Sequence, residues 1–185
     1  MSTPLVVEFQ AGSSGTWRIE RIAAVVGESL PDAGYLNMHE GNQTRAVVDT
    51  PAWALKGITS NTRYTTREEV TRLSARQQGL GRPEAMCAAL IPIRKTAAWW
   101  ALAQDERRAI IEEQSRHIQI GLEYLPAIAR RLHHSRDLGE PFDFVTWFEF
   151  PVSHKAAFET LVQRLRDTEE WRYVEREVDV RLYRE

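Results

Sequence analysis

The chain has 185 residues, a length that suits one domain or two small fused modules around a real hydrophobic core. Its 24 Lys and Arg residues against 26 Asp and Glu residues give a net charge of −2, which excludes the strongly basic field that nucleic acid or an anionic membrane surface requires. Cys87 is the only cysteine, which excludes an intramolecular disulfide and a cysteine-based metal cluster. The first residues lack the basic and apolar regions of a signal peptide, and no apolar run approaches the roughly 18 residues of a membrane span. We therefore expect a cytoplasmic protein without a nucleic-acid or membrane partner.

The N-terminal part of the chain reads mainly as strands and loops. A strand is predicted at 5–9, whereas the mixed hydrophobic period of 17–26 leaves that segment untyped. Residues 27–51 contain several Gly and Pro residues and are predicted to be mostly loop, with room for one short strand at 45–48. Residues 53–64 are expected to be largely extended.

One helix is predicted in this part. Thr66 and Glu69 have the spacing of a capping box, in which the Thr hydroxyl accepts from the third amide and the Glu side chain reaches back. The helix is expected to end at Gly79. Its inner face carries Val70, Leu73 and Gln77.

The C-terminal half has the clearer pattern. A strand at 88–94 is followed by a helix that begins at Asp105 and carries Ile110, Gln114 and His117 on one face. The remaining predicted elements are a strand at 124–132 interrupted by Pro126, an aromatic strand at 142–148, a helix capped by Ser153 with Phe158, Leu161, Val162 and Leu165 on its inner face, and a closing strand at 178–182.

Residues 86–185 thus run strand, helix, strand, strand, helix, strand, which is the ferredoxin-like order. Residues 1–80 read as a shortened second copy. The sequence therefore predicts an α+β fold in which two ferredoxin-like modules, the N-terminal one truncated, form an antiparallel, barrel-like sheet covered by helices. We place the modules at 1–82 and 83–185, within one compact unit.

His117 is the first candidate for chemistry. On spacing alone, a histidine that shares a helix face with Ile110 is more often a satisfied core residue than a ligand. No HxH, HxxxH or HExxH spacing is present, so a zinc site has little support. A lone helical histidine facing a large apolar cavity would suit a haem iron, which needs only one proximal ligand.

Each of the other candidate residues has a purely structural interpretation as well as a functional one. Arg130 and Arg131 must point to opposite faces of a strand, either both at an exposed edge or with one aimed into a pocket to hold an anion. The Trp99–Trp100 pair is either core or the wall of a site for a flat ligand, and Lys95 is either solvated or paired with a carboxylate. Glu170 is either exposed or accepts from a histidine ring. GxGxxG, Walker and GxSxG motifs are absent from the sequence, so nucleotide binding and serine hydrolysis lack their usual support.

Taken together, these residues resemble the chlorite dismutase family of haem proteins. The resemblance is strongest from Gly57 to the C-terminus, and the shortened N-terminal part resembles the short-chain, dimeric branch. The segments that carry it are 57–64 (GITSNTRY), 92–100 (PIRKTAAWW), 113–117 (EQSRH), 124–125 (YL), 130–135 (RRLHHS) and 142–149 (FDFVTWFE).

The resemblance implies a role for each matching position. His117 matches the proximal haem ligand, Glu170 matches the acid that accepts from its other ring nitrogen, and Arg130 matches the distal arginine that chlorite-degrading members have and coproporphyrin-processing relatives lack. Gln77 resembles the distal glutamine of short-chain members, with Gln78 as the alternative register. The positions expected near the haem and its propionates are Tyr64, Lys95, Trp99, Trp100, Asn61 and Ile91.

The implied activity is that of a haem b-dependent chlorite O2-lyase. Chlorite would bind opposite His117, and Cl–O cleavage would leave ferryl haem and hypochlorite. Arg130 would hold that anion until O–O rebound yields chloride and dioxygen. The branch resemblance also implies a homodimer. The alternatives are a coproporphyrin-type haem synthesis decarboxylase, a non-catalytic haem-binding protein of the same fold, and a haem-free dimeric protein.

Overall fold

The computed structural model describes residues 4–41, 50–59, 66–76 and 79–184. The described strands are β1 (Val6–Gly12), β2 (Trp17–Val26), β3 (Tyr35–Glu40), β4 (Trp53–Thr59), β5 (Cys87–Lys95), β6 (Ala129–His134), β7 (Phe144–Phe150) and β8 (Val174–Tyr183). The described helices are α1 (Arg67–Arg76), α2 (Ala97–Ala101), α3 (Gln104–Arg108), α4 (His117–Glu123) and α5 (Lys155–Arg166), with a π-helix η1 (Ala109–Gln114) and the 3-10 turns η2 (Arg136–Leu138), η3 (Val152–His154) and η4 (Glu169–Tyr173). None of the described helices has the length and apolar character to cross a bilayer.

The strands form one closed, antiparallel sheet in the order β1-β3-β2-β8-β5-β7-β6-β4. The N-terminal half contributes the neighbouring strands β4, β1, β3 and β2 in that spatial order, and the C-terminal half contributes β8, β5, β7 and β6. In each half the fourth strand therefore lies beside the first, followed by the third and the second. The shared order confirms the expected α+β architecture of ferredoxin-like modules. The boundary between modules at residue 82 stays a prediction.

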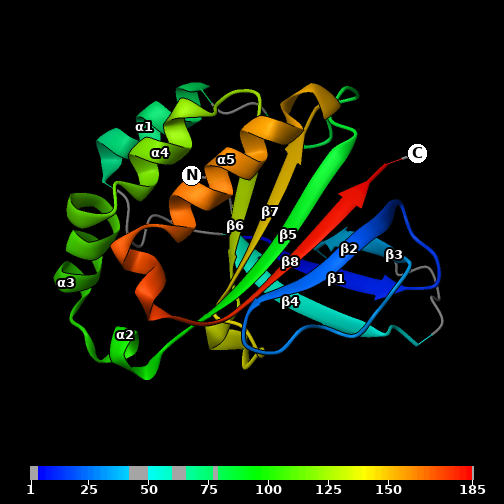
Figure 1. The fold of residues 1–185 in the computed structure, drawn as a ribbon, viewed down its shortest axis with the longest axis horizontal. Coiled ribbons are helices and arrows are strands. Elements are labelled where there is room, and N and C mark those ends of the chain that lie inside the picture. The colour runs from blue at the N-terminus through cyan, green and yellow to red at the C-terminus, as the bar shows by residue number, and fades with distance from the viewer. Residues whose placement is uncertain (1–3, 42–49, 60–65, 77–78, 185) are drawn as a thin grey trace.

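The helices are distributed unequally over this sheet. Helices α2 to α5 lie over the strands of the C-terminal half, whereas β1 to β4 extend to the other side of the molecule (Figure 1). In the N-terminal half, β1 and β2 are joined by a short turn, and the described part of 4–59 contains no helix. The layer between helices and sheet therefore belongs to the C-terminal half, and any site in that layer is built mainly from residues after 86.

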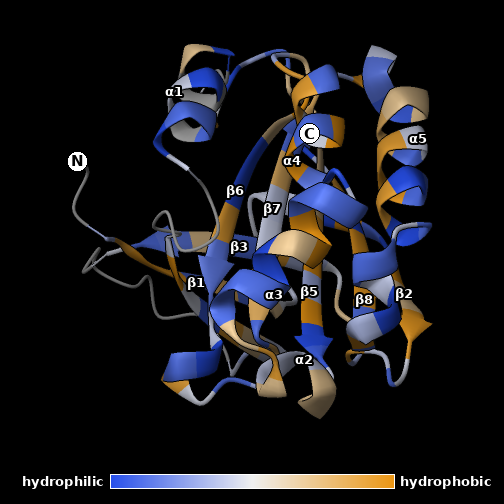
Figure 2. Cartoon of the chain, turned by 90° about the vertical axis from the view of Figure 1, so that its left-hand side faces the viewer, coloured by the Kyte–Doolittle hydropathy of each residue, from blue (hydrophilic) through white to orange (hydrophobic). Residues whose placement is uncertain are grey.

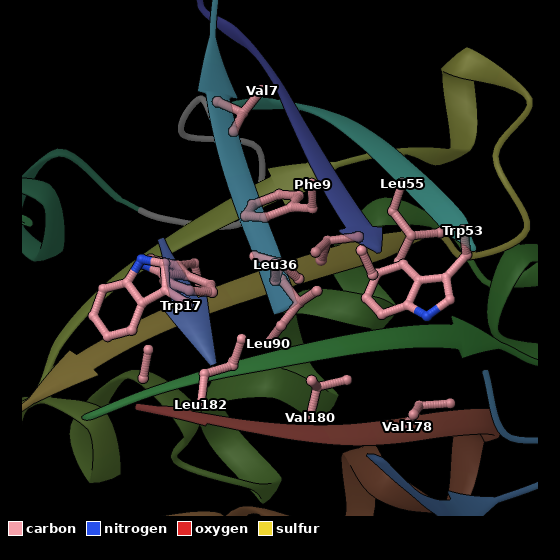
Figure 3. Packing of buried hydrophobic residues seen from close by; sticks show 14 of the residues in the cluster. Val7, Phe9, Trp17, Leu36, Trp53, Leu55, Leu90, Val178, Val180 and Leu182 are labelled. Carbon is pink, nitrogen blue, oxygen red and sulfur yellow. The ribbon is translucent and has the colours of Figure 1, made fainter. Parts of the chain in front are cut away.

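The closed sheet surrounds the main core. Because side chains alternate along a strand, one residue in two points inward. Side chains from β1 to β5, β7 and β8 meet there, and Figure 3 shows part of this cluster. The fully buried members include Phe9, Leu36, Leu90, Trp147 and Val180.

A second core lies between the sheet and the helices. There, α5 buries the four residues predicted as its inner face: Phe158, Leu161, Val162 and Leu165. The same helix shows alternating hydrophilic and hydrophobic bands in Figure 2, as an amphipathic helix should.

Several sequence-based expectations are confirmed. The capping box forms, since the Thr66 amide donates to Glu69 Oε2 at 2.7 Å and the Glu69 amide donates to Thr66 Oγ1 at 3.3 Å. The strand predicted at 88–94 is β5, the one predicted at 142–148 corresponds to β7, and the closing strand is β8. The strand considered at 45–48 lies outside the described residues.

The structure also assigns a segment that the sequence left untyped, and it corrects two expectations. The untyped segment 17–26 is the ten-residue strand β2, and two register shifts against β8 explain its mixed hydrophobic period. Residues 35–40 form β3 inside the segment predicted to be mostly loop. The sequence did not indicate this strand because only Leu36 in it is fully buried, so hydrophobic and polar residues alternate weakly. Ser153 does not cap α5; its hydroxyl lies 3.1 Å from Nδ1 of His154 within η3.

Two further corrections concern the surroundings of the candidate site. The strand predicted at 124–132 begins only at Ala129, since 124–128 form turns around Pro126. The helix predicted from Asp105 to His117 is not continuous, because it passes into the π-helix η1 and then stops.

Candidate haem site

The backbone changes direction immediately before His117. After η1, Arg116 adopts a left-handed conformation with φ 52°, and α4 starts at His117. The Glu112 carboxylate accepts from the amide of Ile118 at 2.6 Å, which satisfies one of the open donors of the new helix. His117 is therefore the first residue of α4, where the preceding kink rather than helical periodicity sets its direction.

A buried carboxylate holds the His117 ring. Glu170 Oε2 lies 2.7 Å from Nδ1 of His117, and Glu170 Oε1 accepts from Nζ of Lys95 at 2.8 Å. The Glu170 amide in turn donates to Oγ of Ser115 at 2.9 Å. The ring also stacks on Trp171, with centroids 6.5 Å apart and planes inclined by 21°. Glu170 and Trp171 of η4 thus contact the imidazole, and Lys95 of β5 and Ser115, which follows η1, hold Glu170 in place.

The charge balance of this group favours an ionised Glu170. Burial alone would raise the pKa of the Glu170 carboxyl, but the neighbouring His117 and Lys95 hold it well below its usual range. The Lys95 and Glu170 side chains are 3% and 8% exposed, so this ion pair is largely shielded from water. A carboxylate in this position increases the electron donation of the imidazole to anything bound at its other nitrogen.

Arg130 approaches from the sheet. It pairs with Phe148 of β7, which pairs with Ala89 of β5, so the three residues form one row on the sheet surface that faces the helices. Arg131 points the other way, into the closed sheet, where it forms an ion pair with Glu40. The alternation predicted for the arginine pair therefore gives one arginine to each side.

Ile91 lies in the next row of the same sheet surface. It pairs with Thr146 and, through β7, is level with Leu132. Its side chain is 5% exposed and packs in the core between sheet and helices. It is placed to form an apolar floor next to Arg130.

The Arg130 guanidinium rests on α4. A Cβ atom added to Gly121 would lie 2.9 Å from Nη1, 3.0 Å from Cζ and 3.1 Å from Nη2 of Arg130. Burial lowers the pKa of this guanidinium, and the carboxylates of Glu112 and Glu170 oppose the effect. His117 and Gly121 are four residues apart on α4, so Arg130 faces the helix that begins with His117.

The tryptophan pair divides between two environments. Trp99 is 1% exposed, with Nζ of Lys95 4.6 Å from its ring centroid, and its indole N–H is buried without a hydrogen-bond partner. Trp100 stacks on Phe144, with centroids 6.0 Å apart, and its N–H donates to Asp143 Oδ2 at 3.2 Å. Asp143 also accepts from the Lys95 amide at 2.7 Å, so it links the end of β5 to α2.

The sequence analysis missed four residues of this arrangement: Ser115, Glu112, Gly121 and Asp143. Asp143 is the one with a signal in the sequence, as a single acidic residue between two phenylalanines of a strongly apolar strand segment. Three predicted site residues, Asn61, Tyr64 and Gln77, and the alternative Gln78, lie outside the described residues.

The free polar atoms of this site, on His117 and Trp99, fit a haem. One imidazole suffices as the protein ligand of a haem iron, and the described residues contain no cluster of three or more His, Cys, Asp or Glu side chains arranged for an ion. Glu170 occupies Nδ1 of His117, which leaves Nε2 as the nitrogen for iron. The unsatisfied indole N–H of Trp99 is a donor that a propionate would satisfy.

Comparison with known proteins gives the family. The family model described as chlorite dismutase matches residues 38–183, which is most of the chain. The chain belongs to the chlorite dismutase family. A chlorite dismutase from Ideonella dechloratans is 34% identical to this chain over 86 residues. These residues are 46% of this chain and 28% of the length of that relative.

Solved structures of the family have the same fold. The crystal structure of a dimeric chlorite dismutase from Nitrobacter winogradskyi has a TM-score of 0.89 and 54% identity, and the match covers 97% of this chain and 99% of that chain. A chlorite dismutase from Candidatus Nitrospira defluvii, solved in complex with imidazole, has a TM-score of 0.68 at 22% identity, with 98% and 91% of the two chains covered. This second likeness extends over almost the whole chain and concerns the fold.

Proposed function

We propose that this protein is a haem b-dependent chlorite O2-lyase, which converts chlorite to chloride and dioxygen. The observation that carries the proposal is the pairing of one imidazole, oriented by buried Glu170, with a guanidinium on the facing sheet surface. Membership of the chlorite dismutase family and the 54% identity to the dimeric Nitrobacter enzyme support the same reaction.

Each residue has a defined task in this proposal. His117 would ligate the haem iron through Nε2, with its ring held by Glu170, and Trp99 would donate to a propionate. When bound, haem supplies the redox chemistry that cleaves the Cl–O bond. Arg130, which stays cationic at neutral pH, would hold the chlorite anion and then the hypochlorite anion near the site of O–O bond formation. Ile91 and its neighbours exclude water there, which strengthens the attraction between arginine and anion.

The first test is haem loading followed by an oxygen electrode. The wild-type protein is expected to show a Soret band and to release dioxygen from chlorite. His117→Ala is expected to lose haem, whereas His154→Ala, a change at the start of α5, keeps it. A wild type that binds no haem, or that binds haem and releases no dioxygen, would overturn the proposal.

The second test addresses the arginine. Arg130→Ala is expected to keep haem and to lose most turnover, or to inactivate rapidly because hypochlorite escapes. Arg130→Lys, which keeps the charge without the planar fork, should lie between the two. An Arg130→Ala variant with full oxygen yield and durability would contradict the assigned task. Clean decarboxylation of iron coproporphyrin with peroxide by the wild type would point instead to the haem-synthesis alternative.

We also propose a homodimer, because the Nitrobacter structure that matches 97% of this chain is that of a dimeric protein. Sedimentation of the haem-loaded protein would measure the mass directly. The cytoplasmic location expected from the sequence stays a prediction.

A further inference from the structure

The indole of Trp171 connects His117 to a buried carboxylate of β8. Its ring stacks on the His117 imidazole, with centroids 6.5 Å apart and planes inclined by 21°. Its Nε1–H donates to Glu177 Oε2 at 2.7 Å. Trp171 is half-buried, whereas the Glu177 side chain is fully buried. One face of the imidazole therefore contacts an aromatic ring whose polar end is tied to the sheet.

The two oxygens of Glu177 have different partners. Oε1 accepts from Nε and Nη2 of Arg166 on α5, at 2.9 and 2.6 Å, and Oε2 accepts from Trp171. A glutamine at position 177 could not satisfy both, because one of its two terminal atoms is an NH2 donor that would face another donor. Since bonds from a guanidinium are the stronger ones, the amide oxygen would stay with Arg166 and the indole N–H would lose its acceptor.

The His117 imidazole needs a support besides Glu170. A hydrogen bond tolerates a departure of about 30° from linearity, so the bond at Nδ1 leaves the ring some rotation about its Cβ–Cγ bond. A flat group against the ring face restricts that rotation. None of these contacts uses Nε2, so all of them are compatible with an iron bound at that nitrogen.

We propose that Trp171 is a positioning residue for His117, and that Glu177, held by Arg166, fixes the indole in place. The contacts themselves are independent of the reaction. Their use, which is to set the rotation of the imidazole that would carry the iron, rests on the proposed function. The support runs from α5 through β8 and η4 to the first residue of α4.

The first experiment records NMR signals of the haem-free protein: the indole N–H of Trp171 and the ring protons of His117. Glu177→Gln is expected to speed the exchange of this N–H with solvent about tenfold, the equivalent of one charge-assisted hydrogen bond. It should also shift the His117 ring protons, because the stacked indole moves relative to them. Unchanged His117 signals in this variant would overturn the inference.

Asp179→Asn is the matched control. Asp179 lies two residues along β8 on the same strand face, is 1% exposed, and has the arginines Arg166, Arg181 and Arg21 as partners. The variant removes one negative charge from the same buried network, so it should lower the melting temperature while leaving the Trp171 and His117 signals unchanged. Equal shifts in Asp179→Asn and Glu177→Gln would indicate a general loss of packing and overturn the inference.

The second experiment uses the haem-loaded protein and measures transfer of haem to an excess of a haem-free globin. Glu177→Gln and Trp171→Phe, which keeps a ring but removes the donor, should each speed haem loss about tenfold. Because both changes break the same support, the double variant should lose haem no faster than either single variant. Multiplied effects would overturn the inference.

Two further measurements keep the test decisive. The electron paramagnetic resonance spectrum of the ferric protein, which responds to the orientation of the axial imidazole, should broaden in Trp171→Phe and stay as in the wild type in Asp179→Asn. If Glu177→Gln fails to fold, Trp171→Phe decides, because this position is half-buried. An unchanged spectrum and an unchanged rate of haem loss in Trp171→Phe would overturn the positioning role.

The two proposals fail in different ways. A wild type without oxygen release, combined with shifted His117 signals in haem-free Glu177→Gln, would overturn the proposed function and leave the support of His117 standing. Oxygen release by the wild type together with unchanged His117 signals in that variant would do the reverse.

Discussion

Glu170 and His117 are joined at 2.7 Å although 53 residues separate them in the chain. The contact depends on three elements that end close together, since η1 brings Ser115 to the Glu170 amide and β5 brings Lys95 to the second carboxylate oxygen. A histidine fixed in this way cannot turn its Nδ1 toward a ligand. Nε2 is therefore the nitrogen left to bind one.

Glu170→Gln tests whether the carboxylate holds the His117 ring in this orientation. The amide keeps the shape but leaves the 3%-exposed Lys95 without a counter-charge, so we expect the free energy of unfolding to fall by about 3 kcal/mol. Haem affinity should fall by about 10-fold to 100-fold, as for other partners of metal-binding histidines. Urea unfolding of the haem-free protein and haem titration measure the two effects.

Glu169→Gln is the matched control for this change. Glu169 lies on the same turn, η4, and its ion pair with Arg172 is exposed to solvent. We expect that variant to stay within about 0.5 kcal/mol of the wild type. Equal behaviour of the two variants would contradict the role of Glu170.

His133 makes the stability of the protein sensitive to pH. The ring is fully buried, with Nδ1 2.9 Å from the carbonyl oxygen of Val145 and Nε2 accepting from Nε of Arg131 at 3.2 Å, so it is neutral in the fold. Burial lowers its pKa from 6.5 to about 4. Below about pH 6.5 the unfolded chain therefore binds a proton that the folded protein excludes.

The free energy of unfolding should accordingly fall by up to about 3 kcal/mol between pH 6.5 and pH 4 on account of this group. His133→Phe removes that part of the slope, whereas His154→Ala, which changes a half-exposed histidine, leaves it in place. Urea unfolding at several pH values gives the slopes. Identical slopes for the wild type and His133→Phe would show that another group is responsible.

Gly57 allows β4 to approach β6. A Cβ at this position would lie 2.5 Å from Cβ of His133 and 2.9 Å from Oγ of Ser135. Neither atom can move far, since both residues are fully buried. We expect Gly57→Ala to lower the free energy of unfolding by about 1–3 kcal/mol, as measured by thermal denaturation. Gly12→Ala should have no such effect.

Cys87 should be unreactive in the folded protein. Its side chain is 1% exposed, and burial raises the pKa of the thiol, so little thiolate forms at neutral pH. A small thiol reagent should label it at the rate at which the protein opens, and at once in denaturant. Rapid labelling of the native protein would contradict this assignment.

Local chemistry made part of the fold predictable. The capping box of Thr66 and Glu69 and the inner face of α5 follow rules that operate within one turn or two, and both are found as expected. The bulged strand β2 was not predictable, because its periodicity shifts with the register of β8, which is formed 150 residues later.

The candidate site shows the same limit. Periodicity placed His117 on the same face as Ile110 of a helix from Asp105, but the left-handed Arg116 and the hydrogen bond from Ile118 to Glu112 start a new helix there. The resemblance to a family brought Glu170, Lys95 and His117 together before any distance was known. It could not reveal that Gly121 and Arg130 lie in contact, because that contact depends on how α4 and β6 pack together.

Two pairs of strands join the two halves of the closed sheet. Across the first, β2 and β8 share seven paired positions, which should protect their amide protons from exchange with solvent. Across the second, the pairs between described residues join Ile58 and Thr59 of β4 to His134 and His133 of β6. These two histidines are three and four residues from Arg130 on the same strand. Local opening of this junction would therefore act on the strand that carries Arg130.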